Sequence, residues 1–293
     1  GAPAFNSDEI SCMGPCMPND DPASSAGADS AAARPAEAET TSHRVPGDGL
    51  ALRLTDELNR FDRDLSHPNT EPRDAATLIV IDRSGDAPKV LLGLRHQRHK
   101  FLPGKFVFPG GRVEVSDRNV ATATELDPRV VARLMMRMRR PSPAKARAFA
   151  IAAIRETFEE TGLILGPAAG VVTAAPEGPH VSLASAGLRP DLAAMHLIAR
   201  AITPPRRPRR FDTRFFALDA RDISGKVEGV VGPDAELIEL VWLPLTEAER
   251  LDMPPITKAV LAELEHRIAC GFTHDLPVPF YRWIGRRFTR SVL

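Results

Sequence analysis

The chain has 293 residues, of which 43% are hydrophobic and 26% charged, and its formal net charge at pH 7 is zero. That length is enough for one sizeable core, and no apolar run approaches the roughly 18–20 residues of a membrane span. A zero net charge argues against general attraction to nucleic acid or to an anionic membrane. Only three cysteines occur, and the N-terminus lacks the basic-then-apolar pattern of a signal peptide. We therefore expect a cytoplasmic protein without membrane or nucleic-acid partners.

Residues 1–70 are rich in Ala, Pro, Ser, Asp and Glu and show no sustained hydrophobic periodicity. Such a composition buries too little apolar surface to fold, so this segment is predicted to be a mostly disordered tail. A short helix is conceivable over residues 50–61. The folded domain is expected over residues 71–293.

The domain begins with three apolar runs that predict strands. Residues 76–81 and 89–94 are separated by a turn sequence, which indicates an antiparallel hairpin. A third, short strand over residues 106–108 ends at Pro109, Gly110 and Gly111. Paired glycines allow a backbone group to approach a ligand closely, because no side chain stands in the way.

Two helices are predicted next. Asp127 is a suitable N-cap and Pro128 a suitable first residue for a short helix through residues 130–136. Ser142 and Pro143 start a longer helix in the same way, and Gly162 can end it in a left-handed conformation.

The end of the longer helix carries an unfavourable charge pattern. Glu156 and Glu160 lie one turn apart with Glu159 between them, close to the negative end of the helix dipole. Like charges at this spacing cost roughly 0.2–0.5 kcal/mol, and each acid near that end costs roughly another 0.3–1 kcal/mol. Arg155 can pair with Glu159, but no base follows Glu160 by three or four residues. A bound divalent cation would remove this conflict.

The rest of the chain predicts further strands at residues 200–203, 213–218 and 238–242, and helices at residues 190–195, 246–251 and 257–268. The last two helices are expected to close the chain. Strands mixed with helices indicate a mixed sheet that is covered by helices.

The acidic helix end and the preceding glycines resemble the signature of the Nudix hydrolases, G-x5-E-x7-R-E-U-x-E-E-x-G-U, in which U is a bulky apolar residue. The matching residues are Gly111, Arg155, Glu156, Glu159, Glu160, Gly162 and Leu163, with Asp117 in place of the first Glu and Thr157 in place of the first U. Residues 118–154, 37 in all, stand where the signature has 7, so the box holds an insertion at about residues 118–147. This resembles the branch typified by the peroxisomal acyl-coenzyme A diphosphatase, as does the stretch at residues 209–216. The resemblance implies an α/β fold, a Nudix-type α/β/α sandwich with a mixed sheet, here with a helical insertion and C-terminal helices.

The resemblance also implies roles for the acidic residues. Glu156 and Glu160 would be ligands of Mg²⁺ or Mn²⁺, Glu159 a further ligand or a supporting catalytic group, and Gly111 a ligand through its carbonyl. Arg155 would orient the acids by ion pairing. A later loop often supplies a base to the attacking water in this family. Glu236 is our candidate for this base, and Glu239 is the alternative.

Arginines and a phenylalanine are the candidates for substrate binding. Arg95, Arg209 and Arg210 can clamp phosphates because guanidinium groups match phosphate geometry. Phe211 or Phe215 can stack on a nucleobase, although packing in the core of a strand is the better interpretation for at least one of them. The basic residues at 206–210 also resemble a surface patch that binds nucleic acid, but the zero net charge disfavours that interpretation.

The resulting hypothesis is a metal-dependent hydrolase that cleaves the diphosphate of a nucleoside-diphosphate derivative, with coenzyme A or acyl-coenzyme A as the favoured substrate. ADP-ribose, dinucleotides and other diphosphates are alternatives within this class. A non-catalytic nucleotide sensor with the same fold is the alternative from another class. Many relatives form dimers, so the resemblance allows a homodimer.

Overall fold

The computed structural model describes residues 48–60, 66–98, 102–166, 183 and 187–293.

The central strand of the fold is β1 (Arg73–Asp82), whose side chains alternate between two apolar cores. Leu78 and Val80 belong to one core, and Ile79 and Ile81 belong to the other. Since successive side chains of a strand point to opposite faces, β1 is buried on both sides of its sheet.

The sheet around β1 is mixed. β1 runs parallel to β7 (Phe211–Asp219) and pairs at Ile81 with Val90 of the antiparallel strand β2 (Lys89–Arg95), as the predicted hairpin requires. The strand order is β11-β10-β6-β7-β1-β2-β3, with β4 attached to β1 and β9 attached to β2. The remaining bounds are β3 (Phe106–Val107), β4 (Gly110–Arg112), β6 (His196–Ile202), β9 (Leu237–Pro244), β10 (Pro279–Ile284) and β11 (Arg287–Val292). A separate two-stranded sheet contains β5 (Leu163–Leu165) and β8 (Ile223–Lys226).

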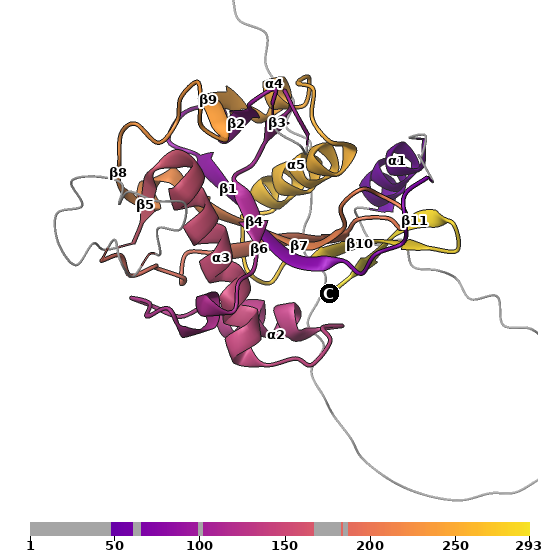
Figure 1. Ribbon diagram of the computed structural model, residues 1–293. Coiled ribbons are helices and arrows are strands. Elements are labelled where there is room, and N and C mark those ends of the chain that lie inside the picture. Colours follow the sequence, from indigo (N-terminus) through magenta and orange to yellow (C-terminus); the bar gives the residue numbers. More distant parts are fainter. Residues whose placement is uncertain (1–47, 61–65, 99–101, 167–182, 184–186) are drawn as a thin grey trace, which may run out of the picture. The chain divides into compact units, whose positions relative to one another are not determined.

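Helices cover both faces of the large sheet. α2 (Pro128–Met135) and α3 (Pro143–Thr161) contribute to the core that contains Leu78. α1 (Asp48–Asn59), α4 (Leu245–Ala248) and α5 (Pro255–Ala269) contribute to the core that contains Ile79. In Figure 1, β1 passes between α3 and α5. The predicted α/β/α sandwich with a mixed sheet is confirmed.

The two helices of the box region begin and end at the predicted residues. The Asp127 side chain accepts a hydrogen bond from the Arg129 amide at 2.8 Å, and the Ser142 hydroxyl accepts one from the Lys145 amide at 3.2 Å. Gly162 ends α3 with φ 76°, and its amide donates to the Phe158 carbonyl at 2.8 Å. These caps satisfy backbone groups that have no partner within the helix.

Residues 190–195 do not form the predicted helix. They form a turn, because the side chains of Thr124 and Asp191 provide the hydrogen bonds that a helix would have provided. The Thr124 hydroxyl accepts from the amides of Leu192 and Ala193 at 3.0 Å each, and the Ala123 amide donates to the Pro190 carbonyl at 2.9 Å. Such side-chain bonds compete with helix formation. The helix predicted at residues 246–251 is also shorter, since α4 covers only Leu245–Ala248.

The prediction that helices close the chain was wrong, because the hairpin of β10 and β11 follows α5. Pro277 and Pro279 prevent a helix from continuing here. Phe280 then packs into one core and Tyr281 into the other, and the two residues pair with Arg200 and Ala201 of β6. The hairpin therefore extends the sheet.

The predicted N-terminal helix is present as α1, and it is part of the folded unit. Leu54 and Leu58 are buried in a core, and the compact unit begins at Gly49 rather than at residue 71. Residues 1–47 and 61–65 of the predicted tail lie outside the described residues. In the part of the chain that the structure describes, no helix is long and apolar enough to cross a membrane.

Candidate active site

The insertion separates Asp117 from Arg155 in the sequence, but the two residues are in contact in the structure. Asp117 lies in the 3₁₀ turn η1 (Ser116–Asn119) and is fully buried. Its carboxylate accepts from Arg155 Nε at 2.9 Å and from Nη2 at 3.3 Å. Arg155 Nη2 also donates to the Arg112 carbonyl at 2.8 Å. The inserted segment therefore leaves Asp117 in contact with α3, and the shorter carboxylate fills the place of the first Glu.

Arg155 also contacts two acids of its own helix. Its Nη1 atom lies 2.9 Å from Glu156 Oε1 and 3.3 Å from Glu159 Oε2. Burial by itself lowers the pKa of Arg155, but the hydrogen bonds of Asp117 and the neighbouring negative charges raise it above its ordinary value. Arg155 is therefore a positive charge in contact with three carboxylates.

The paired glycines lie directly against the acidic helix end. A Cβ atom at position 111 would overlap the Glu156 carboxylate, which would have to move away from its present position. The Gly110 amide donates to Glu160 Oε2 at 3.2 Å. This backbone contact could not be foreseen from the sequence, although the glycine pair indicated a close approach.

Arg95 joins the acidic helix end to Glu236. It lies at the end of β2, with Nη2 2.9 Å from Glu236 Oε1 and 3.8 Å from Glu160 Oε1. Burial, and then the charge of Glu236, raises the pKa of Glu160 well above its ordinary value, against the opposing effect of Arg95. Glu160 and Glu236 therefore lie close together, on either side of Arg95.

Glu156 and Glu159 are half-buried, and their charged forms are less favourable than in water. Burial raises the pKa of both carboxyl groups, and Arg155 opposes this in each case. The charge of Glu236 raises the pKa of Glu156 further. We call the set Glu156, Glu159, Glu160 and Glu236 the carboxylate cluster.

The carboxylate cluster fits a hard divalent cation by its chemistry. Its donors are oxygens, which Mg²⁺ and Mn²⁺ prefer, and a cation would stabilise the charged carboxylates against burial and mutual repulsion. In the described part of the chain, no three His, Cys, Asp or Glu side chains already surround one point. Arg155 pairs with Glu156 and Glu159, while Arg95 pairs with Glu236.

The other predicted site residues lie in different surroundings. Arg210 braces the start of β7, since its Nε donates to the Thr203 carbonyl at 3.1 Å and its Nη1 to Asn69 Oδ1 at 2.9 Å. Phe211 is half-buried, and Arg209 is exposed.

Two alternatives can be separated by their positions. Phe215 is buried in the core of α5, so it packs rather than stacks on a ligand. Glu239 lies in β9 opposite Leu94, and its side chain makes no described contact with the carboxylate cluster. Glu236 makes such a contact through Arg95.

No family model matches the chain. It is similar to the solved structure of a Nudix hydrolase from Alicyclobacillus acidocaldarius, with 28% identity and a TM-score of 0.49 over 68% of this chain and 96% of that chain. It is also similar to the NUDIX domain of Shewanella oneidensis NrtR complexed with ADP ribose, with 13% identity, a TM-score of 0.38 and coverage of 68% and 90%. A C. elegans Ap4A hydrolase has 14% identity, a TM-score of 0.33 and coverage of 67% and 99%.

The insertion separates Asp117 from the rest of the box in the sequence, but the structure brings Asp117 and Glu156 into contact with Arg155, near the end of a helix that packs on a mixed sheet. This arrangement agrees with the resemblance to the Nudix hydrolases, and membership of that family stays a prediction. Membership of the branch with a long insertion stays a prediction.

Proposed function

We propose that the chain is a divalent-metal-dependent hydrolase that cleaves a diphosphate linkage in a nucleoside-diphosphate derivative. The observation that carries this proposal is the acidic end of α3, where the buried Glu160 accepts from the Gly110 amide, the Glu156 carboxylate lies against Gly111, and Glu160 shares Arg95 with Glu236. A site that only bound a neutral or anionic ligand would gain nothing from such a concentration of negative charge.

Glu156, Glu160 and the Gly111 carbonyl would hold Mg²⁺ or Mn²⁺, with Glu159 as a further ligand or a support. The bound cation would neutralise charge on the diphosphate and make a coordinated water more acidic. The chain's own part is to keep these oxygens together. Arg155 does so by holding Glu156 and Glu159 at fixed positions, while the buried Asp117 fixes Arg155 in turn.

Glu236 is the proposed base for the attacking water. Its side chain is 40% exposed while its carboxylate contacts Arg95, so it reaches both solvent and the cluster. A base needs a hydrogen-bond path to the proton that it removes, and the contact of Glu236 with Arg95 supports Glu236 over Glu239 for this role. Arg95 is the proposed phosphate clamp at the site itself, since it already binds carboxylates there.

Coenzyme A or acyl-coenzyme A is the proposed substrate, and ADP-ribose, dinucleotides and other diphosphates are the alternatives. The support for coenzyme A is the position of the insertion within the box and the stretch at residues 209–216. In this proposal, Arg209, Arg210 and Phe211 contact the nucleoside part. A cytoplasmic location and a homodimer stay predictions.

Hydrolysis of a panel of these compounds with Mg²⁺ or Mn²⁺, measured as release of phosphatase-sensitive products, tests the proposal. We expect Glu160→Gln to lower turnover at least about a hundredfold, the order of effect of losing one group that acts on the reacting atoms. The variant should fold, because glutamine can still accept from the Gly110 amide and no longer buries a charge. The matched control Glu239→Gln should be as active as the original chain.

Two results would contradict the proposal in different ways. Full activity of Glu160→Gln would remove this residue from the metal site. Failure of every compound with both metals would instead favour the non-catalytic sensor.

A further inference from the structure

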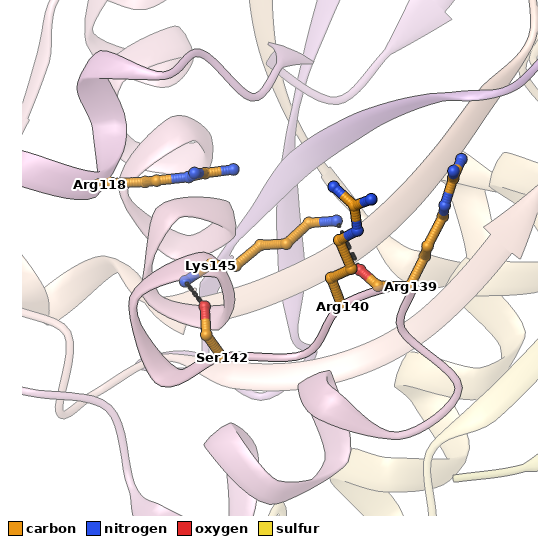
Figure 2. A pocket seen from close by; sticks show the side chains of 5 residues that line it. All are labelled: Arg118, Arg139, Arg140, Ser142 and Lys145. Atoms are coloured by element: carbon orange, nitrogen blue, oxygen red, sulfur yellow. Dashed lines mark hydrogen bonds between the residues drawn. The ribbon is translucent and has the colours of Figure 1, made fainter.

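A cavity of about 350 Å³ lies at the end of α3 that is opposite to the carboxylate cluster. It is lined by Arg118, Arg139, Arg140, Ser142 and Lys145 (Figure 2). Four of these five residues are bases, and none is an acid. Such a lining selects for an anion.

The four basic side chains of the cavity come from separate segments of the chain. Arg118 follows the buried Asp117 in η1, Arg139 and Arg140 belong to the segment between α2 and α3, and Lys145 lies in the first turn of α3. In Figure 2, the side chains of Arg118 and Lys145 extend side by side toward Arg140. Lys145 Nζ donates to the Arg139 carbonyl at 3.3 Å, which holds the two sides of the cavity together. The insertion within the box is what supplies this arrangement.

The positive charge of the cavity is only partly balanced. Lys145 Nζ lies 3.1 Å from Asp74 Oδ2. Arg139 lies 3.8 Å from Glu71, but both side chains are largely exposed, so water screens this pair. Arg118 and Arg140 make no ion pair with a carboxylate in the described part of the chain. Two guanidinium groups therefore remain for a ligand, which matches the charge of a phosphate monoester.

The charge pattern at this end of α3 is the reverse of what a helix prefers. The first turn contains no acid, and Lys145 opposes the positive end of the helix dipole. An anion in the cavity would be favoured by the dipole and would offset the repulsion among the bases. The cavity and its four side chains thus give a reason for a pattern that is otherwise unfavourable.

We propose that this cavity binds a phosphate monoester, chiefly through Arg118 and Arg140 and with the help of Lys145. Guanidinium groups bind phosphate oxygens in pairs, which gives direction as well as charge. The volume exceeds that of phosphate alone and lies in the range of small-molecule sites. The cavity therefore has room for the organic group that would carry the phosphate.

The position of the cavity limits where this phosphate comes from. Lys145 and Glu156 are eleven residues apart in α3, which is about 16 Å along the helix axis. A second phosphate on the ribose that bears the diphosphate cannot span this length. The monoester belongs either to the far end of a longer substrate or to a separate effector molecule.

Titration of the full chain with inorganic phosphate, in buffer without divalent cations, tests the site by calorimetry. We expect the double variant Arg118→Gln/Arg140→Gln to bind phosphate at least about tenfold more weakly, because two charge-assisted contacts are lost. The control is Arg286→Gln/Arg287→Gln, an exposed pair at the turn between β10 and β11. Arg286 has φ 69° and Arg140 has φ 52°, so the backbone conformations are also matched.

Equal affinity in the original chain and the double variant would overturn the proposal, and so would an equal loss in the control. Glu160→Gln should keep the affinity of the original chain. If it abolished phosphate binding, the phosphate would lie at the carboxylate cluster and not in this cavity. Because the titration needs no turnover, its outcome is independent of the proposed diphosphate hydrolysis.

Steady-state kinetics then assign the source of the phosphate. If it is part of the substrate, the double variant should raise KM at unchanged kcat only for substrates that carry the extra monoester. If it belongs to an effector, inorganic phosphate should change the rate of the original chain and leave the rate of the double variant unchanged. Either result supports the site.

Discussion

Five carboxylates and two guanidinium groups meet at the C-terminal end of α3. Arg155 contacts Asp117, Glu156 and Glu159, while Arg95 contacts Glu160 and Glu236. Burial first, and then the neighbouring negative charges, raise the pKa values of Glu156, Glu159 and Glu160. At the scale of single residues, the site is therefore organised to receive positive charge.

His196 presents a different electrostatic problem, away from the carboxylate cluster. Its ring stacks on His274 with centroids 3.9 Å apart, and its Nδ1 atom is buried without a hydrogen bond in the described part of the chain. Burial first, and then the charges of His274, Arg267 and Arg83, lower the pKa of His196 to about 3, against the opposing effect of Asp127.

This pKa makes stability depend on pH. The unfolded chain binds a proton at this histidine near pH 6.5, and the folded chain does not until about pH 3. The stability that neutral His196 confers is therefore present above the unfolded pKa and is lost as pH falls. We predict that His196→Phe loses less free energy of unfolding than the original chain between about pH 7.5 and about pH 5, measured by urea unfolding. The same loss in both proteins would contradict this pKa.

The sequence predicted part of this residue-scale arrangement. The acids at the end of a helix were visible because their spacing conflicts with the helix dipole. The contact of Asp117 with Arg155 follows only from the resemblance, since 37 residues separate the two and no periodicity joins them. The contact between Glu236 and Arg95 needed the structure, because no local pattern in the sequence joins these two residues.

At the scale of elements, α3 connects the box to the insertion. Val130 and Leu134 of α2 are buried in the same core as Phe149 and Ile151 of α3. The insertion is therefore part of the packed domain as well as the source of the basic cavity. Its helices were predictable from local caps, whereas the turn at residues 190–195 depends on Thr124, which is distant in the sequence.

A substitution at Gly162 tests how strictly the backbone at the end of α3 is fixed. It has φ 76°, and a Cβ atom there would overlap the Val227 carbonyl oxygen. We predict that Gly162→Ala lowers the free energy of unfolding by more than the roughly 1–3 kcal/mol of an unfavourable backbone conformation alone. Denaturant unfolding measures this.

The control for this substitution is Gly229→Ala. Gly229 has φ 82°, but nothing lies within 4 Å of its Cβ position, so it carries the backbone cost without the overlap. The difference between the two variants isolates the contact with Val227. Equal losses would show that the end of α3 can shift to make room.

At the scale of the whole molecule, a net charge of zero hides two regions of opposite sign. The carboxylate cluster lies at one end of α3, and the bases Arg118, Arg139, Arg140 and Lys145 lie at the other. A sum over the composition could exclude a generally basic or acidic protein, but it could not show this separation. The fold creates this separation of charge. The inserted segment supplies basic residues at the start of α3, whereas Arg95 at the end of β2 contacts Glu160 at the end of α3.

Binding of Mn²⁺ to the full chain, followed by isothermal titration at neutral pH, tests the carboxylate cluster most directly. We predict saturable binding to the original chain and to Glu239→Gln, and its loss in the double variant Glu156→Gln/Glu160→Gln. Absence of binding to the original chain, or equal binding to the double variant, would contradict a metal site at the end of α3.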